Sequence, residues 1–319
     1  MMIRTVIQLS YGIPGIISYF LVFYVMFRIR GILSRSFVVI YVLMAVSNMI
    51  TWVNAWIYLK LTSEPFFFFY YEWLEKQPFL INLHLFLTFH LYYVQNIDLL
   101  LLTLDRFAAV LSMLNDTKLW KKSYPFIALI LHAIFAAAQL ATSLPLDSKL
   151  FLNSQTGGYE FVEDDLGKSV IYKKATQWVY SNLQKKPLAA IVQIGFGIFI
   201  FLSCSILNIA SLRYMRHVKS TKFSSIEKSF FVISFCIFLT QFMNLIMVCL
   251  VGIFQFTSHP FDDYMRTVIE LVYYSSDLFS IGPALYTLLL PGPIRRFLIQ
   301  KSTQTLRVSV ESDGRASTT

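Results

Sequence analysis

The sequence predicts an all-α membrane protein: a bundle of seven transmembrane helices with its N-terminus outside and its C-terminus in the cytoplasm. The prediction depends on the composition, on the length of the apolar segments, and on the basic residues between them. Of the 319 residues, 56% are hydrophobic and only 14% are charged, and the mean hydropathy is +0.59. A typical soluble domain has roughly 25% charged residues. A lipid bilayer accepts this much apolar surface, whereas water does not.

Seven apolar segments follow one another along the chain. About 20 apolar residues, rising about 1.5 Å each in a helix, cover a hydrocarbon core of about 30 Å. Each segment is expected to be helical, because a backbone in lipid must satisfy its own hydrogen bonds. Residues 1–300 are therefore expected to form one membrane domain, and residues 301–319, rich in Ser and Thr, a disordered cytoplasmic tail. The predicted spans lie near Val6–Phe27, Ser36–Leu59, Phe79–Leu104, Tyr124–Leu144, Leu188–Leu212, Ser229–Phe256 and Thr267–Leu290.

The basic residues between the spans predict the orientation. Counted over alternate loops and the two tails, 17 of the 27 Lys and Arg residues lie on the side of the C-terminus and 10 on the side of the N-terminus. In this count Lys60 and Lys76 belong to the first outside loop. Because cytoplasmic loops carry the excess of Lys and Arg, the N-terminus is expected outside.

The outside loops suggest two further features. The longest loop, Pro145–Pro187, contains Gly157-Gly158 and an acidic run at 163–165, so part of it is expected to be irregular and solvated. Six consecutive aromatic residues, Phe66 to Tyr71, occupy the first outside loop. They form either an aromatic belt at the membrane interface or the lining of a ligand entrance.

Motifs of enzymes and metal sites do not occur in the sequence. It contains no Gly-rich phosphate loop, no HExxH and no CxxC, and the six-residue spacing of His84 and His90 is poor for a shared metal face on a helix. We therefore expect no enzymatic activity, no metal site and no cofactor. The net charge of +9 is distributed between apolar runs rather than on a polar domain, so the expected partner is the lipid bilayer and not a nucleic acid.

The third predicted span has a polar face. His84, Thr88, Gln95 and Asp98 follow the three- and four-residue spacing of one helix face. Polar side chains on a membrane helix are expected to face the bundle interior. Either this face forms hydrogen bonds between helices, or its outer part, His84 and Thr88, contributes to a ligand pocket while Asp98 acts deeper as a switch.

The seventh span contains two acidic residues on one face, Glu270 and Asp277. Glu270 is near the outer boundary and is a candidate for the ligand pocket. Asp277 is near mid-depth and needs a polar partner; Asn48 and Asn244 lie at a comparable depth in other spans. The sequence leaves two interpretations open, a buried hydrogen-bond network of Asp98, Asp277, Asn48 and Asn244, or a proton or cation site.

Two short motifs lie at the cytoplasmic ends of the third and seventh spans. Asp105-Arg106-Phe107 resembles the Asp-Arg-aromatic motif of rhodopsin-like G-protein-coupled receptors, and the segment from Pro283 to Tyr286 resembles their Pro-x-x-Tyr element. An Asp-Arg pair can hold an arginine back in one state and release it to a partner in another. A proline in a helix removes a backbone hydrogen bond and permits a bend. Asp105, Arg106, Pro283 and Tyr286 are therefore the candidate coupling residues.

Three longer stretches resemble the nematode chemoreceptors called serpentine receptor class gamma: Tyr11 to Pro14, Leu104 to Val110, and Leu290 to Arg295. The resemblance covers roughly residues 1–300. It implies a chemosensory receptor that binds an extracellular small molecule and activates a heterotrimeric G protein, in the plasma membrane of a sensory neuron or its cilium.

The sequence departs from the rhodopsin-like pattern in two places. The outside loops contain no cysteine, and Gly282 stands where Asn is usual. The alternative function is a transporter that couples ions through Asp98, Glu270 and Asp277.

Overall fold

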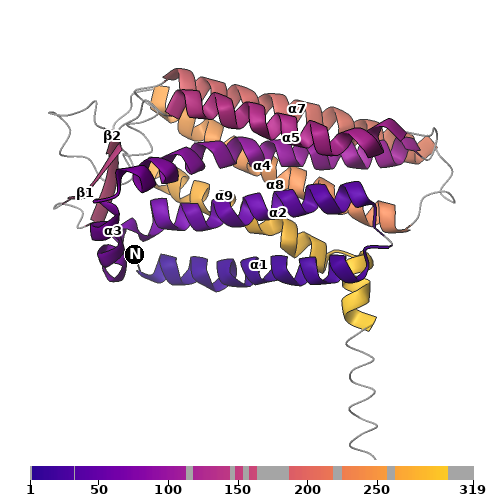
Figure 1. Ribbon diagram of the computed structural model, residues 1–319, viewed down its shortest axis with the longest axis horizontal. Coiled ribbons are helices and arrows are strands. Elements are labelled where there is room, and N and C mark those ends of the chain that lie inside the picture. Colours follow the sequence, from indigo (N-terminus) through magenta and orange to yellow (C-terminus); the bar gives the residue numbers. More distant parts are fainter. Residues whose placement is uncertain are drawn as a thin grey trace, which may run out of the picture.

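In the part of the chain that the structure describes, seven long helices lie side by side along the longest axis of the molecule (Figure 1). The computed structural model describes residues 2–31, 33–112, 118–143, 148–153, 158–163, 187–217, 225–256 and 263–300. The expected tail, 301–319, lies outside the described residues. The long helices are α1 (Met2–Arg28), α2 (Arg35–Ala55), α4 (Pro78–Ser112), α5 (Lys118–Ser143), α7 (Pro187–His217), α8 (Ser225–Phe256) and α9 (Asp263–Leu289).

Five of these helices have a described part that is long and apolar enough to cross a membrane. The described part of α5 contains a shorter apolar stretch, Ser123–Ala137. Large apolar side chains cover the outside of the bundle, among them Phe27 at 75% exposure and Phe126 at 69%. An all-α membrane bundle is therefore confirmed. The five spans are Thr5–Arg28, Arg35–Tyr58, Pro78–Leu111, Val192–Arg216 and Lys228–Leu250.

The helix of the third span is longer than the apolar segment that predicts it. The apolar segment ends at Leu104, whereas α4 continues to Ser112. The charged pair at 105–106 ended the predicted segment, but the helix continues through the apolar residues 107–111. Asp105 and Arg106 therefore lie within the helix, in a buried position, rather than in a loop.

Short elements connect α2 to α4. A π-helical turn, Trp56–Lys60, continues α2 directly, and 3-10 turns at Leu61–Ser63 and Pro65–Phe67 lead into α3 (Phe68–Leu74). These elements lie at the same end of the bundle as the N-terminus (Figure 1).

A two-stranded antiparallel hairpin lies beside α3 at this end, which we call the hairpin end (Figure 1). Its strands are β1 (Ser148–Asn153) and β2 (Gly158–Glu163), and Ser148 pairs with Glu163. The long loop was expected to be partly irregular, but Gly158 and Glu163 belong to a regular strand. In β2, the apolar residues Tyr159 and Phe161 alternate with Glu160, and they lie opposite Leu152 and Leu150 of the apolar run in β1. Gly157 and the rest of the acidic run lie outside the described residues.

The aromatic run of the first loop packs against this hairpin. Tyr71 is fully buried and stacks on Tyr159 of β2 with 5.4 Å between ring centroids, and Phe68 meets the same ring at 5.3 Å. Phe66 and Phe69 are exposed. Part of the run thus fixes the hairpin to the bundle, and part of it is exposed. The interface belt and the ligand entrance both stay predictions.

Helix α4 is the centre of the bundle, where it packs against α2, α5, α7 and α8. Helix α9 packs against α1, α2 and α8. Two glycines let α1 approach its neighbours closely: a Cβ on Gly12 would lie 2.5 Å from the ring of Trp52, and one on Gly15 would lie 2.8 Å from Cβ of Ile281. Small residues at such contacts favour close helix packing in membranes.

Candidate functional site

The candidate residues occupy three levels of the bundle. At the hairpin end, His84 and Thr88 are brought together by Asn54 of α2. His84 Nδ1 lies 2.7 Å from Asn54 Oδ1, and Asn54 Nδ2 donates to Thr88 Oγ1 at 2.9 Å. The hydroxyl of Tyr70 lies 3.3 Å from His84 Nε2 and so connects this group to α3. Sequence analysis did not single out Asn54, although an amide within an apolar span indicates a polar contact.

Asp277 is paired with a lysine from another helix. Lys60 Nζ lies 2.5 Å from Asp277 Oδ1, and each side chain is only 3% exposed. The hydroxyl of Tyr11 donates to Asp277 Oδ2 at 2.7 Å. The interaction joins α1, the π-helical turn and α9. The ammonium of Lys60 also lies 5.0 Å from the centre of the Trp56 ring.

Two expectations from the sequence are therefore wrong. Lys60 is buried in the bundle and is not a loop residue, because the π-helical turn prolongs α2 without a break and directs Lys60 inward. The partners of Asp277 are Lys60 and Tyr11, rather than Asn48 or Asn244. Positional depth alone favoured the two asparagines; a cation satisfies a buried carboxylate better than an amide does.

Helix α3 also forms a hydrogen bond with the π-helical turn that contains Lys60. The hydroxyl of Tyr71 donates to the carbonyl of Ile57, within the π-helical turn, at 2.5 Å. Burial raises the pKa of the Tyr71 hydroxyl, which therefore remains a donor at neutral pH. Thr5 of α1 donates to Glu64 at 2.5 Å. These two hydrogen bonds connect α3 to the turn that contains Lys60, and α1 to the segment between that turn and α3.

A closed hydrogen-bond network crosses the middle of the bundle. Gln95 of α4 donates to Asn48 Oδ1 at 2.8 Å and to Ser280 Oγ at 3.2 Å. Asn48 donates to the Tyr19 hydroxyl at 2.9 Å, and that hydroxyl donates to the carbonyl of Ser280 at 2.5 Å. Four helices, α1, α2, α4 and α9, are joined by these contacts.

Asn244 belongs to a different contact, accepting a hydrogen bond from Ser275 at 3.2 Å between α8 and α9. Asn48, Asn244, Asp98 and Asp277 therefore lie in separate clusters and do not form a single network.

Asp98 faces α5, where His132 is its partner. Asp98 is completely buried, and its Oδ1 lies 3.1 Å from His132 Nε2. His132 Nδ1 lies 2.7 Å from the carbonyl of Ala128, which only accepts, so Nδ1 is the donor there. The proton between His132 Nε2 and Asp98 Oδ1 is then carried by one of these two atoms. Sequence analysis missed His132, although it is a single histidine in an apolar helix.

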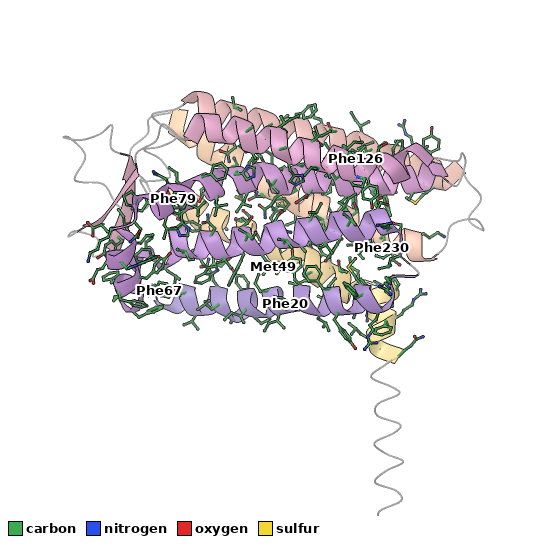
Figure 2. All side chains as sticks on the ribbon, in the orientation of Figure 1. Phe20, Met49, Phe67, Phe79, Phe126 and Phe230 are labelled. Carbon is green, nitrogen blue, oxygen red and sulfur yellow. The ribbon has the colours of Figure 1, made fainter. Side chains whose placement is uncertain are left out.

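Arg106 lies in the bundle at the end opposite the hairpin, which we call the Arg106 end. It is 4% exposed and forms an ion pair with Asp105. Its guanidinium lies 4.6 Å from the ring centre of Phe37 on α2 and 5.5 Å from that of Phe230 on α8. Its Nη2 also donates to Ser34 Oγ at 3.4 Å. Figure 2 shows Phe230 near this end and Phe67 at the hairpin end.

The Pro283 element of α9 is held by tyrosines. The Tyr41 hydroxyl donates to the carbonyl of Pro283 at 3.1 Å and lies 3.0 Å from Thr287 Oγ1. The Tyr286 hydroxyl lies 2.6 Å from Thr240 Oγ1 of α8. A Cβ on Gly282 would lie 3.1 Å from the Tyr286 ring, so glycine at this position allows the ring to lie back along its own helix.

Metal binding and the position of Glu270 are the remaining questions about the predicted site. Within the described part of the chain, no group of three His, Cys, Asp or Glu side chains is placed to hold a metal ion. Glu270 lies on α9, but its side chain is outside the described residues. Its predicted place in a ligand pocket therefore stays a prediction.

Comparison with known proteins agrees with this architecture. A family model described as "Srg family chemoreceptor" matches residues 5–298, a range that includes the seven long helices apart from the first residues of α1. The match confirms the resemblance to serpentine receptor class gamma. No curated protein matches the chain.

Proposed function

This chain belongs to the Srg family of chemoreceptors, and from this premise we propose that it binds a small extracellular molecule at the hairpin end and activates a heterotrimeric G protein at the Arg106 end. The protein is an integral membrane receptor. Its proposed location is the plasma membrane of a sensory neuron, including the cilium. The proposed membrane domain spans residues 1–300, with a cytoplasmic tail at 301–319.

The proposed orientation places the hairpin end outside. The excess of Lys and Arg in alternate loops supports it. Among the described residues, Arg213 and Arg216 at the end of α7 are exposed on the Arg106 side, where a basic rim suits an acidic protein surface or anionic lipid.

A buried Arg106 at the end of the central helix is the observation that carries the coupling proposal. An arginine with no role other than fixing topology lies at lowest cost with its guanidinium in water. Arg106 instead makes contacts with α2, α8 and Asp105 inside the bundle. This arrangement suits a cation that is withheld in one state and released in another.

The ligand is proposed to act near His84 and Thr88, with Glu270 at the same end. Asn54 and Tyr70 connect these residues to α2 and α3. A ligand that replaces one of these polar contacts perturbs α2 and α4 together. Thr88, Gln95 and Arg106 lie on one continuous helix, α4, so a change at the hairpin end has a direct mechanical path to the opposite end.

Ion transport receives less support from the contacts of the acidic residues. Asp277 is neutralised by Lys60, and Asp98 is in contact with His132. A carboxylate that already has a cationic or imidazole partner is a poor binding group for a second cation.

The test is expression in a heterologous cell with a promiscuous Gα subunit and a calcium readout, using a panel of small organic molecules. Wild-type protein is expected to respond to some members of the panel. The Arg106→Ala protein is expected to reach the surface and give no response, whereas the control Arg30→Ala, which removes an exposed arginine outside the basic rim, is expected to respond normally. A wild-type response from Arg106→Ala contradicts the coupling role. A ligand-gated current or uptake that needs no G protein favours a channel or transporter instead.

A further inference from the structure

Three buried hydrogen-bond donors at the hairpin end have no acceptor in the part of the chain that the structure describes: Nε2 of Gln8, Nε1 of Trp52 and Nε1 of Trp56. We propose that these three groups, the donor cluster, form a further ligand site that binds the carbonyl oxygen of a small neutral molecule, such as a ketone or an ester. The site lies between α1 and α2 and is separate from the one proposed near His84 and Thr88. Its test measures binding and needs no G protein.

Close packing of α1 on α2 brings the three donors together. A Cβ on Gly12 would lie 2.5 Å from the ring of Trp52 and 3.2 Å from its Nε1, so the N–H edge of this indole lies against α1. Gln8 precedes Gly12 by four residues and Trp56 follows Trp52 by four, so each shares a helix face with its partner. Helix α1 begins and α2 ends at the hairpin end (Figure 1), so Gln8 and Trp56 both lie one turn nearer to that end.

The members of the donor cluster cannot satisfy one another. An indole N–H has no lone pair with which to accept, and the amide nitrogen of a glutamine also only donates. The ring centroids of Trp52 and Trp56 are 5.4 Å apart, so the two indoles are neighbours that cannot form a hydrogen bond between their nitrogens. Buried polar groups in proteins are nearly always paired. Three unpaired donors on facing helices therefore indicate an acceptor that binds between these helices.

The nearby ion pair favours a neutral ligand. The ammonium of Lys60 lies 5.0 Å from the centre of the Trp56 ring, and its charge is balanced by Asp277, which also accepts a hydrogen bond from Tyr11. The three donors themselves carry no charge. An anionic ligand would bring an uncompensated charge into a buried site, which is costly. A carbonyl oxygen supplies the acceptor without that charge.

The remainder of the ligand is expected to be apolar. Trp52 and Trp56 belong to one buried cluster with Leu61 and Ile281. The two indole side chains are 9% and 4% exposed, and Gln8 is 1% exposed. Ligand sites generally combine apolar walls with a few polar groups that fix the orientation of the ligand. A molecule with one carbonyl group on a hydrocarbon chain matches this combination.

The donor cluster and the predicted pocket residues lie on opposite faces of α2. Asn54, which contacts His84 and Thr88, is two residues after Trp52 and two before Trp56. Two residues correspond to a rotation of about 200° in a helix, so Asn54 points to α4 while the two indoles point to α1. A ligand in each site would therefore contact a different face of the same helix.

The test observes the indole N–H groups directly. The full chain is labelled with ¹⁵N in its tryptophans and purified in lipid nanodiscs, and the indole signals are assigned by Trp→Phe replacement. Methyl hexyl ketone is added as the probe. The indole protons of Trp52 and Trp56 are expected to shift downfield and to reach saturation, because a proton that enters a hydrogen bond is deshielded. Trp73, 50% exposed at the same end, is the internal control and is expected to keep its position.

Variants separate binding from packing. Gln8→Leu removes the amide and is expected to weaken binding of the ketone roughly 2- to 10-fold through one lost hydrogen bond. Because the amide nitrogen has no partner among the described residues, this variant without ketone is expected to be at least as stable to heat as wild type. Trp52→Phe and Trp56→Phe keep an aromatic ring and are expected to weaken binding by a similar factor. Trp73→Phe is the matched control and is expected to bind normally.

Two compounds of the same chain length test the chemistry of the ligand. Octylammonium only donates and is expected to cause no shift, and octanoate is expected to bind more weakly than the ketone. The proposal is overturned if the ketone leaves both indole signals in place, as it does where water alone satisfies these groups. It is also overturned if octanoate binds more tightly than the ketone, or if Gln8→Leu and both Trp→Phe variants bind the ketone as wild type does.

Failure of the proposed function gives a different result. The indole signals of Trp52 and Trp56 then shift with the ketone as expected, but no small molecule changes nucleotide exchange on an added heterotrimeric G protein.

Discussion

The buried ion pair of Lys60 and Asp277 is expected to be the most costly single polar contact to break among those described. Its two side chains are 3% exposed and their charged atoms are 2.5 Å apart. Lys60→Met removes the cationic partner of Asp277 and leaves the hydrogen bond from the Tyr11 hydroxyl. Removal of one member of a buried pair costs about 3–5 kcal/mol, because the other charge stays in a medium of low dielectric constant.

The double variant Lys60→Met with Asp277→Asn is expected to recover most of this loss. It contains no uncompensated charge, and the amide oxygen of Asn still accepts the hydrogen bond of Tyr11. The coupling energy of the cycle is therefore expected to be several kcal/mol, on the order of the cost of either single replacement. Lys76→Met is the matched control, since Lys76 is exposed at the same end of the bundle and its loss is expected to have little effect.

The measurement is thermal denaturation of the purified variants in one detergent, followed with a fluorogenic maleimide. Cys236 and Cys249, which are only partly buried, are replaced by alanine in every variant, so that the reaction of the fully buried Cys204 reports unfolding. Each single variant is expected to lower the midpoint on the order of 10 °C, by the scaling for domains of similar size. The double variant is expected to fall close to wild type. If the double variant loses as much as the two single variants together, the pair does not hold the bundle in the way that its geometry indicates.

Three other outcomes are expected. Asp105→Asn should raise ligand-independent nucleotide exchange at matched surface expression, because it removes the anionic partner of Arg106; an unchanged basal rate contradicts its role as a restraint. Alanine at both His84 and Thr88 should raise the half-maximal ligand concentration on the order of tenfold through lost hydrogen bonds, and a dose–response equal to wild type at normal surface expression removes them from the pocket. Asn115, which lies outside the described residues, begins the sequence Asn-Asp-Thr in the second predicted cytoplasmic loop, so it should carry no glycan. A glycosidase-sensitive mass shift that disappears in Asn115→Gln would overturn the orientation.

Hydropathy and helical spacing predicted the helical membrane bundle, because the requirement for internal hydrogen bonds in lipid leaves few other folds. They also predicted that the polar face of α4 points inward: Gln95 and Asp98 are buried, as the cost of exposing them to lipid demands. Composition gave no reason to expect the hairpin, because its strands are short and are held by the aromatic residues of a loop far away in the sequence. Lys60 was misplaced because a loop is inferred where charge begins, whereas the backbone continues as a π-helical turn.

The contacts that connect α9 to the bundle show why the remainder of the site was beyond sequence reasoning. Tyr19 and Tyr41 donate to the backbone carbonyls of Ser280 and Pro283. Every residue has a carbonyl, so no side-chain pattern in α9 identifies these acceptors. The donors are equally inconspicuous, because a tyrosine in an apolar span looks like another aromatic residue for packing or for the interface. The same holds for the rings beside Arg106: Phe37 and Phe230 belong to a chain with 30 phenylalanines, and only their distance to Arg106 separates them from the rest. An acidic partner for Arg106 can be sought by its charge, but a restraint made of aromatic rings becomes visible only when the helices are placed in three dimensions.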